Sequence, residues 1–259
     1  MTVKFEDGRS GMVAADLRIE DAATVGLAAT QFNVFVNTVL ATGEGTGAVS
    51  WLNLAFRLMY LPIGLFGVSI ATAVLPAVSR HAARQDTGAI RTTIADGLSL
   101  MMMLNVPATV GLIVLAHPIV QVIFEHGRFT TADTAATASA LGYYAVGLLG
   151  YSVVRIASPT FYALGRNRTP VTVSMITVVA NATLSILLVR VFGFRGLALG
   201  TSLAALFNAT VLLTLLRRHL GGLVGEQLAD AAHRVVRQHA PVRFHCIEQI
   251  GRGVADIRL

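Results

Sequence analysis

The stretch VSWLNLAFRLMYLPIGLFGVSIATAVLPAV, residues 49–78, contains a single charged side chain, that of Arg57. A helix needs about 20 consecutive apolar residues to cross about 30 Å of hydrocarbon, and this stretch is longer than that. A helix at the surface of a soluble protein has one face in water and carries charge along that face. Residues 49–78 have no such face, so they predict a helix that spans a membrane.

Outward from this stretch, the chain repeats the same pattern on both sides. The mean hydropathy of the chain is +0.66 and only 13% of its residues are charged. Charged residues collect between long apolar stretches and near the end of the chain. The pattern predicts an all-α, polytopic membrane bundle of about six transmembrane helices, over residues 22–42, 49–78, 98–117, 135–164, 171–192 and 197–216.

The two ends of the chain have a different composition from the bundle. Residues 1–21 are polar and mixed in charge, without the apolar core of a signal peptide, so we expect the first span to direct insertion. Residues 22–220 form the predicted bundle. Residues 221–259 read as a polar, basic cytoplasmic tail, either disordered or out of frame. The tail contains four potential metal ligands, namely His233, His239, His245 and Cys246. Their spacing matches no known ligand pattern, so we expect no metal site and no cofactor.

The arginines predict the orientation of the bundle. Seven of them flank connections that would share one side, namely Arg80, Arg84, Arg91, Arg166, Arg168, Arg217 and Arg218. The other side has three, namely Arg128, Arg190 and Arg195. Because cytoplasmic loops are enriched in Lys and Arg, the N-terminus and the tail are predicted to be cytoplasmic. This flanking role also explains the net charge of +6 without a nucleic-acid partner.

Two arginines lie within apolar stretches, where charge is costly to bury. The Arg57 side chain could reach the membrane interface beside Trp51 and Tyr60, as part of an aromatic belt. Alternatively, its guanidinium could face a water-filled cavity and bind a phosphate or diphosphate in a bidentate manner. Arg155 lies about two turns from a predicted cytoplasmic loop, and the same two interpretations apply to it.

Neutral polar residues and prolines also recur within the spans. Amides and hydroxyls in spans commonly form hydrogen bonds between helices, which is the role we predict for Asn37, Asn181, Ser185, Thr201 and Asn208. Three prolines lie within the spans, namely Pro62, Pro107 and Pro159. They predict kinked helices, which suit a transporter that rocks between two openings. The spans contain no carboxylate and the chain contains no hydrolase, nucleotide-binding or zinc-protease motif, so we do not expect an enzyme.

Three segments together resemble a known family. They are GAVSWL at residues 47–52 with its continuation through LPIGLFGV and LPAVSR to residue 80, FYALG at 161–165 followed by RTPV at 168–171, and GLALGTSLAA at 196–205. In this order they resemble the MurJ/MviN family of lipid II flippases, within the multidrug, oligosaccharidyl-lipid and polysaccharide exporter superfamily. The resemblance covers about residues 22–220.

The resemblance implies a fold and a function. Members of the family have fourteen spans in two lobes around a cationic cavity. They move lipid II, the undecaprenyl-diphosphate-linked peptidoglycan precursor, outward across the bacterial inner membrane for cell-wall synthesis. This chain resembles spans seven to twelve, one lobe of the two. The expected partners are therefore lipid II, membrane lipids and a separate N-terminal lobe of six spans.

The resemblance also implies candidate site residues. Arg57 matches the family's cavity arginine in the eighth span, which favours the diphosphate-binding interpretation over the interface. The positions at which relatives bind sodium correspond to Asn37, Asn181, Ser185 and Thr201. Asn37 and Ser185 stand where relatives often carry an acid. The remaining oxygen ligands could hold a cation weakly.

Several alternatives stay open. Spans one to six and thirteen to fourteen of the family have no counterpart in the 259 residues, which suggests a truncated or frameshifted reading frame or a genuine short variant. The chain could instead be a flippase for another polyprenyl-linked sugar, or a membrane fragment that transports nothing. An enzyme that acts on the lipid-linked sugar is disfavoured by the lack of acid–base residues in the spans.

Overall fold

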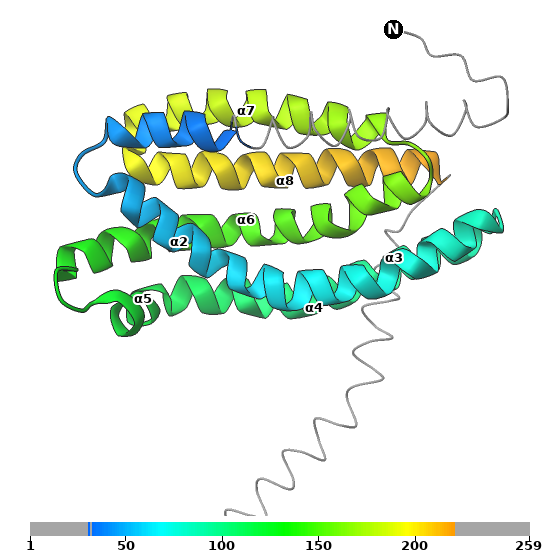
Figure 1. Cartoon of the computed structure of the whole chain (residues 1–259), viewed down its shortest axis with the longest axis horizontal. Helices are drawn as coiled ribbons and strands as arrows, with labels where there is room; N and C mark the ends of the chain where they lie inside the picture. The colour runs from blue at the N-terminus through cyan, green and yellow to red at the C-terminus, as the bar shows by residue number, and fades with distance from the viewer. Residues whose placement is uncertain (1–30, 32, 221–259) are drawn as a thin grey trace, which may run out of the picture.

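Long helices that run alongside one another make up the described part of the chain, which is residue 31 and residues 33–220 of the computed structural model (Figure 1). A short helix, Asn33–Thr42, comes first. It is followed by α2 (Ala48–Pro62), the π-helical turn η1 (Ile63–Gly67), α3 (Val68–Ala83), α4 (Thr87–Val114), α5 (Ala116–Phe124), α6 (Thr131–Ala163), α7 (Arg168–Phe192) and α8 (Phe194–His219). Residues 33–220 contain no strand, so the predicted all-α class is confirmed.

Five helical segments are long and apolar enough to cross a membrane. They are Ala48–Ala83, Thr87–Val114, Thr131–Ala163, Arg168–Phe192 and Phe194–His219. Five of the six predicted spans therefore coincide with membrane-length helices. The remaining predicted span is the first in the chain, over residues 22–42. Of this span the structure describes the helix Asn33–Thr42 and residue 31. The terminal segments 1–21 and 221–259 lie outside the described residues, together with the histidines and Cys246 of the tail.

Two details of the predicted spans are wrong. The third span begins well before Leu98, because the Asp86 carboxylate caps the helix by accepting a hydrogen bond of 2.9 Å from the backbone N–H of Ala89. It also ends earlier, and His117 belongs to α5. Pro62 does not interrupt the second span: the helix continues through the wider π turn that follows the proline, which accommodates the missing backbone donor.

Glycines allow α6 and α8 to pack closely in the middle of the bundle. A Cβ atom placed on Gly147 would lie 2.8 Å from the Ser202 hydroxyl, and one on Gly150 would lie 2.7 Å from the backbone of Ala205. The Ser202 hydroxyl donates a hydrogen bond of 2.8 Å to the backbone carbonyl of Tyr143. Small residues with a bridging hydroxyl are typical of helix contacts inside membranes.

Two hydrophobic clusters occupy the two halves of the bundle. One includes Ile94, Phe161 and Leu212, and it joins α3, α4, α6, α7 and α8. The other includes Met59 and Leu141, and it joins the first helix, α2, α5, α6 and the start of α8. Between them, α6 and α8 carry polar and small residues in place of large apolar ones.

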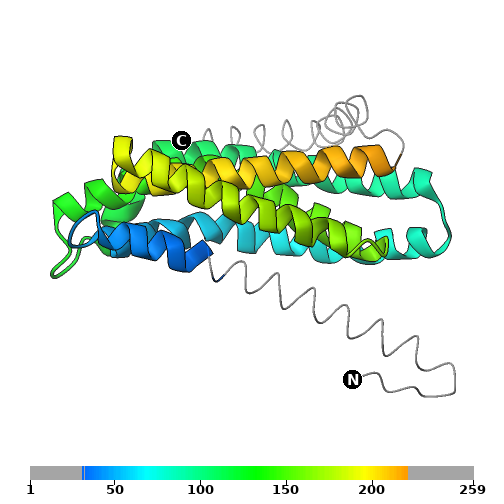
Figure 2. The same ribbon diagram turned by 90° about the horizontal axis from the view of Figure 1, so that it is seen from above.

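The arginine-rich connections share one end of the bundle, called the basic end here. In Figure 1 the end of α3, the α6–α7 connection and the end of α8 all lie on the right, and Figure 2 shows the same grouping. The connections after the first helix, between α5 and α6, and between α7 and α8 lie at the opposite end. The seven arginines that were predicted to share one side of the membrane therefore lie at the same end of the bundle.

At the opposite end, polar contacts tie α2 to α6. The Trp51 indole N–H donates a hydrogen bond of 2.8 Å to the Asp133 carboxylate, which also caps α6 by accepting bonds from the backbone N–H and hydroxyl of Thr130. The Trp51 ring lies 5.3 Å from that of Phe194, at the start of α8. Trp51 therefore contacts both α6 and α8 at this end of the bundle.

Candidate functional site

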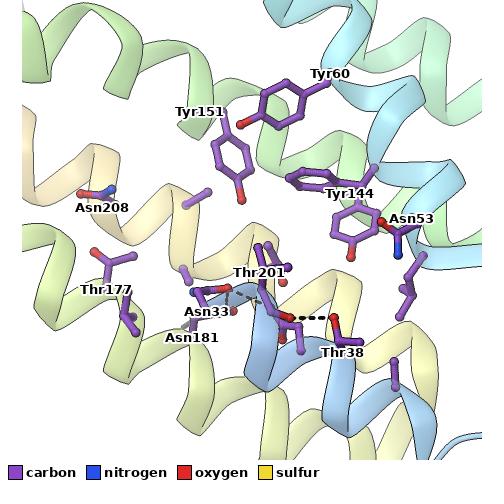
Figure 3. Close-up of a pocket in the computed structure, with 18 of the residues that line it drawn as sticks. Asn33, Thr38, Asn53, Tyr60, Tyr144, Tyr151, Thr177, Asn181, Thr201 and Asn208 are labelled. Atoms are coloured by element: carbon purple, nitrogen blue, oxygen red, sulfur yellow. Dashed lines mark hydrogen bonds between the residues drawn. The ribbon is translucent and has the colours of Figure 1, made fainter. Parts of the chain in front are cut away.

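A cavity of about 320 Å³, the first cavity, lies where the first helix, α2, α6, α7 and α8 meet (Figure 3). Its volume is within the usual range of small-molecule sites. Amides, hydroxyls, aromatic rings and small apolar residues line it, and none of its described lining residues is charged. Those that the argument uses are Asn33, Asn53, Phe56, Tyr60, Tyr144, Tyr151, Asn181, Thr201 and Asn208.

On one side of this cavity, four residues form a hydrogen-bonded group, called the polar network here: Asn33, Asn37, Asn181 and Ser185. The Asn33 carbonyl oxygen accepts hydrogen bonds from the amide of Asn37, at 2.9 Å, and from that of Asn181, at 2.8 Å. The Ser185 hydroxyl donates to the side-chain oxygen of Asn37, at 3.1 Å. The predicted hydrogen bonding between helices is confirmed for Asn37, Asn181 and Ser185, and the network connects the first helix to α7.

Thr201, the fourth residue of the candidate cation site, is not part of this network. Its hydroxyl donates a hydrogen bond of 2.9 Å to the backbone carbonyl of Leu197 in its own helix, while its side chain lines the first cavity. Asn208 also departs from its predicted role, because its buried side-chain oxygen has no partner among the described residues. The cation site therefore stays a prediction, with Asn37, Asn181 and Ser185 brought together and Thr201 apart.

Aromatic side chains from α2 and α6 form the opposite side of the cavity, called the aromatic wall here: Phe56, Tyr60, Tyr144 and Tyr151. The Phe56 ring centroid lies 4.9 Å from that of Tyr60 and 5.4 Å from that of Tyr144. Tyr60 and Tyr151 lie 6.1 Å apart. These separations are those of tilted and edge-to-face ring pairs, so the wall is an ordered surface.

A second cavity, of about 480 Å³, continues from the first toward the basic end, between α2, α3 and α6. The two cavities share Tyr60, Tyr151 and Val154 as lining residues. Arg155 lines the second cavity, and the aliphatic part of its side chain lies against η1, where a Cβ on Gly67 would be 3.9 Å away. A guanidinium at the edge of a largely apolar cavity is suited to an anionic group attached to an apolar chain.

Arg57 is exposed on α2 and lines neither cavity. It lies one helical turn from Asn53 and from Tyr60, both of which do line the first cavity. No ion pair joins Arg57 or Arg155 to any described residue, and the described residues hold no group of three or more His, Cys, Asp or Glu side chains that could bind a metal.

The aromatic wall was not predicted from the sequence. Tyr144 and Tyr151 are spaced seven residues apart on α6, and Phe56 and Tyr60 are spaced four apart on α2. These spacings place each pair on one face of its helix, which is the signal that could have found them.

Comparisons with known proteins agree with this architecture. The family model described as "Lipid II flippase MurJ" matches residues 17–244. The chain is 34% identical to a probable lipid II flippase MurJ of Vibrio cholerae over 190 residues, which cover 73% of this chain and 36% of that protein. It is 34% identical to a probable lipid II flippase MurJ of Bdellovibrio bacteriovorus over 241 residues, 91% of this chain and 46% of that protein.

Solved structures show the same fold. A lipid II flippase MurJ in an inward closed conformation matches with a TM-score of 0.70 and 27% identity, over 85% of this chain and 46% of that chain. An outward-facing multidrug resistance MATE family transporter matches with a TM-score of 0.71 and 12% identity, over 86% of this chain and 50% of that chain, which shows the fold alone. The chain thus spans half or less of the length of these proteins. It belongs to the MurJ family of lipid II flippases.

Proposed function

We propose that this chain takes part in moving lipid II, or a closely similar lipid-linked diphosphate sugar, across the bacterial inner membrane. Family membership supports the class of function. The observation that carries the proposal is the presence of two arginines, Arg57 and Arg155, in membrane-length helices, without an ion-pair partner among the described residues. Charges inside membrane spans are costly and usually mark the path of a substrate or ion.

The two arginines lie at different depths in the bundle. At 1.5 Å per residue, Arg57 is about 14 Å from the start of α2, and Arg155 is about 12 Å from the end of α6. Because α2 begins and α6 ends at opposite ends of the bundle, the two guanidinium groups are well separated along its axis. Each could bind a diphosphate in a bidentate manner, so a substrate could pass from one to the other during transport.

We propose that the basic end faces the cytoplasm, since arginine is concentrated there. Cysteines introduced one at a time at Gly45 and Arg84, in a Cys246→Ser background, would test this orientation. In intact spheroplasts, an impermeant thiol reagent should label Gly45→Cys, and Arg84→Cys should react only after the membrane is disrupted. The reverse pattern would contradict the proposed orientation.

We further propose that the chain works with a lobe of six spans that corresponds to the other half of its relatives. One lobe offers a diphosphate few positive charges, and alternating access needs a second lobe to move against. In cells depleted of their own lipid II flippase, the chain should restore growth only when such a lobe is co-expressed. Failure in both arrangements, with both proteins present in the membrane, would favour a fragment that transports nothing.

The polar network predicts that transport does not depend on sodium. Its four side chains are neutral and bond to one another, so no carboxylate is left to attract a cation. In proteoliposomes that hold the chain and its partner lobe, replacing sodium with choline should change transport less than about twofold, whereas Ser185→Asp should make transport sodium-dependent. A loss of transport by the unmodified chain in choline would contradict this interpretation.

A further inference from the structure

The membrane-length segment Ala48–Ala83 changes its packing partners halfway along. The buried residues of α2, such as Met59, belong to the hydrophobic cluster that contains Leu141. Those of α3, such as Val78, belong to the other cluster, together with Phe161. The two halves of this segment are therefore attached to different parts of the bundle, and η1 connects them.

The backbone hydrogen bonds of this segment lose their α-helical register at η1. The N–H of Ile63 donates to the carbonyl of Tyr60, three residues earlier, and the N–H of Val68 donates to that of Ile63, five residues earlier. Pro62 has no N–H, so the carbonyl of Leu58 loses its usual helical partner. Because prolines and π turns are the common sites of helix bending, η1 is the point at which this segment bends most easily.

A second break in helical bonding lies on α4. Pro107 removes the N–H that the Met103 carbonyl would accept from. Asn105, beside it, is fully buried, and its side-chain oxygen has no partner among the described residues. An unpartnered buried polar group is rare in native structures and calls for an explanation. This part of α4 faces η1, because a Cβ atom placed on Gly67 would lie 4.0 Å from the terminal methyl carbon of Met101.

The two breaks lie at the same distance from the basic end. Pro62 is about 32 Å from the end of α3, and Pro107 is about 30 Å from the start of α4, at 1.5 Å per residue. Figure 1 shows the two helices along one edge of the bundle, joined at the basic end. They pack closely, since a Cβ atom on Gly97 would lie 2.7 Å from a methyl group of Val74. Residues 68–106 therefore form a two-helix unit, called the arm here.

We propose that the arm pivots at η1 and Pro107, and that this motion opens and closes the second cavity toward the basic end. One wall of this cavity comes from the arm, with Val68 and Leu75 of α3. The facing wall comes from α6, with Arg155 and Ser158. None of the described residues that line the first cavity belongs to the arm, so the motion leaves that cavity unchanged.

Packing limits the size of the motion. Ile94 of the arm packs against Phe161 of α6 in one apolar cluster, which opposes a large separation. A tilt of about 10° about a pivot roughly 30 Å away moves the end of the arm by about 5 Å. Within the arm, α3 can move most, since only Ile70 and Val78 of its 16 residues are buried. The motion lies within this chain and is distinct from the movement of one lobe against another.

Distances between spin labels on the full chain, in nanodiscs of phosphatidylethanolamine and phosphatidylglycerol, test the pivot. In a Cys246→Ser background, labels at Arg84→Cys and Arg166→Cys report on the end of the arm and on the α6–α7 connection. We expect two populations for this pair, which differ by about 5 Å. Control pairs at the opposite end or within the arm should each give one narrow distance: Thr46→Cys with Arg128→Cys, and Ser69→Cys with Thr92→Cys.

Substitutions at the pivot should change these populations. Gly64→Ala adds no steric contact, because a Cβ atom there would meet nothing within 4 Å. Alanine favours a regular helix over glycine by about four- to fivefold in population, so the population with the longer distance should fall by that factor. Pro62→Ala combined with Pro107→Ala restores both missing N–H groups and should remove that population. Gly142→Ala, on α6, also meets nothing within 4 Å and should leave both populations unchanged.

Access to the second cavity provides an independent measurement. Ser158→Cys lines that cavity, and its reaction with a water-soluble methanethiosulfonate reagent should slow about four- to fivefold when Gly64→Ala is added. Asn53→Cys lines the first cavity instead and should react at the same rate with and without Gly64→Ala.

A single narrow distance between Arg84→Cys and Arg166→Cys would overturn the proposal and show that η1 is a static bend. Equal effects of Gly64→Ala and Gly142→Ala, a broad distance within the arm, or an unchanged reaction rate at Ser158→Cys would also overturn it. Neither measurement involves lipid II or a partner lobe, so the outcome is independent of the growth test of the proposed function.

Discussion

Replacing Arg57 with alanine is expected to abolish growth in flippase-depleted cells that are supplied with this chain and a six-span partner lobe. The guanidinium is exposed on α2 and has no ion-pair partner among the described residues, so we expect its loss to leave the fold intact and to remove the proposed diphosphate contact. A hydrogen bond to a charged group contributes about 1.5–3 kcal/mol, which corresponds to roughly tenfold to more than a hundredfold in affinity. The measurement is colony formation after depletion, with immunoblots of the membrane fraction.

A matched set of variants separates recognition from charge alone. Arg57→Lys should restore growth only in part, because an ammonium keeps the charge and lacks the planar fork that binds two oxygens. Arg190→Ala removes an exposed arginine near the end of α7 and should grow normally. Full rescue by Arg57→Ala would instead favour a side chain that merely reaches the membrane interface.

Replacing Gly150 with alanine is expected to lower stability strongly. The added methyl would lie 2.7 Å from the backbone carbon and oxygen of Ala205 and 2.8 Å from the backbone nitrogen of Leu206. Backbone atoms cannot rotate away as a side chain can, so α6 and α8 must separate. Overpacking of this kind costs about 1–3 kcal/mol or more. Thermal unfolding in detergent, followed by size-exclusion chromatography, should show a clearly lower midpoint.

Gly142 is the matched control for this effect. It lies on the same helix, and a Cβ atom there would meet nothing within 4 Å. Alanine is favoured over glycine in a helix by about 0.8–1.0 kcal/mol, so Gly142→Ala should raise the unfolding midpoint slightly. The two substitutions thus have opposite expected signs. Equal midpoints for the two variants would show that α6 and α8 are not packed as closely as described.

The membrane bundle could be predicted from the sequence because its signal is local. Hydrocarbon imposes a minimum length on every span, and residues such as 49–78 and 171–192 satisfy it without reference to the rest of the chain. The limits of α4 were harder to predict. They depend on the cap by Asp86, which starts the helix before the apolar stretch, and on the break before α5, which ends the helix before His117.

The candidate site was only partly predictable, because its parts come together through tertiary contacts. Asn37 and Asn181 stood out as amides within apolar stretches, and their network follows from the contact between the first helix and α7. The aromatic wall drew no attention, since tyrosine and phenylalanine are ordinary residues of a span. Thr201 and Asn208 both line the first cavity, which depends on the rotation of α8 about its axis. Apolar patterning does not fix that rotation when most faces of the helix are apolar.

The contact between Trp51 and Asp133 gives the molecule an intrinsic optical reporter. The chain has one tryptophan, so all of its indole emission comes from this residue. The ring donates to a carboxylate on α6 and lies against Phe194 at the start of α8, so it senses both helices at once. If this end opens to water, the hydrogen bond breaks and the emission shifts to longer wavelength. The fluorescence spectrum can therefore follow opening of this end without any attached dye.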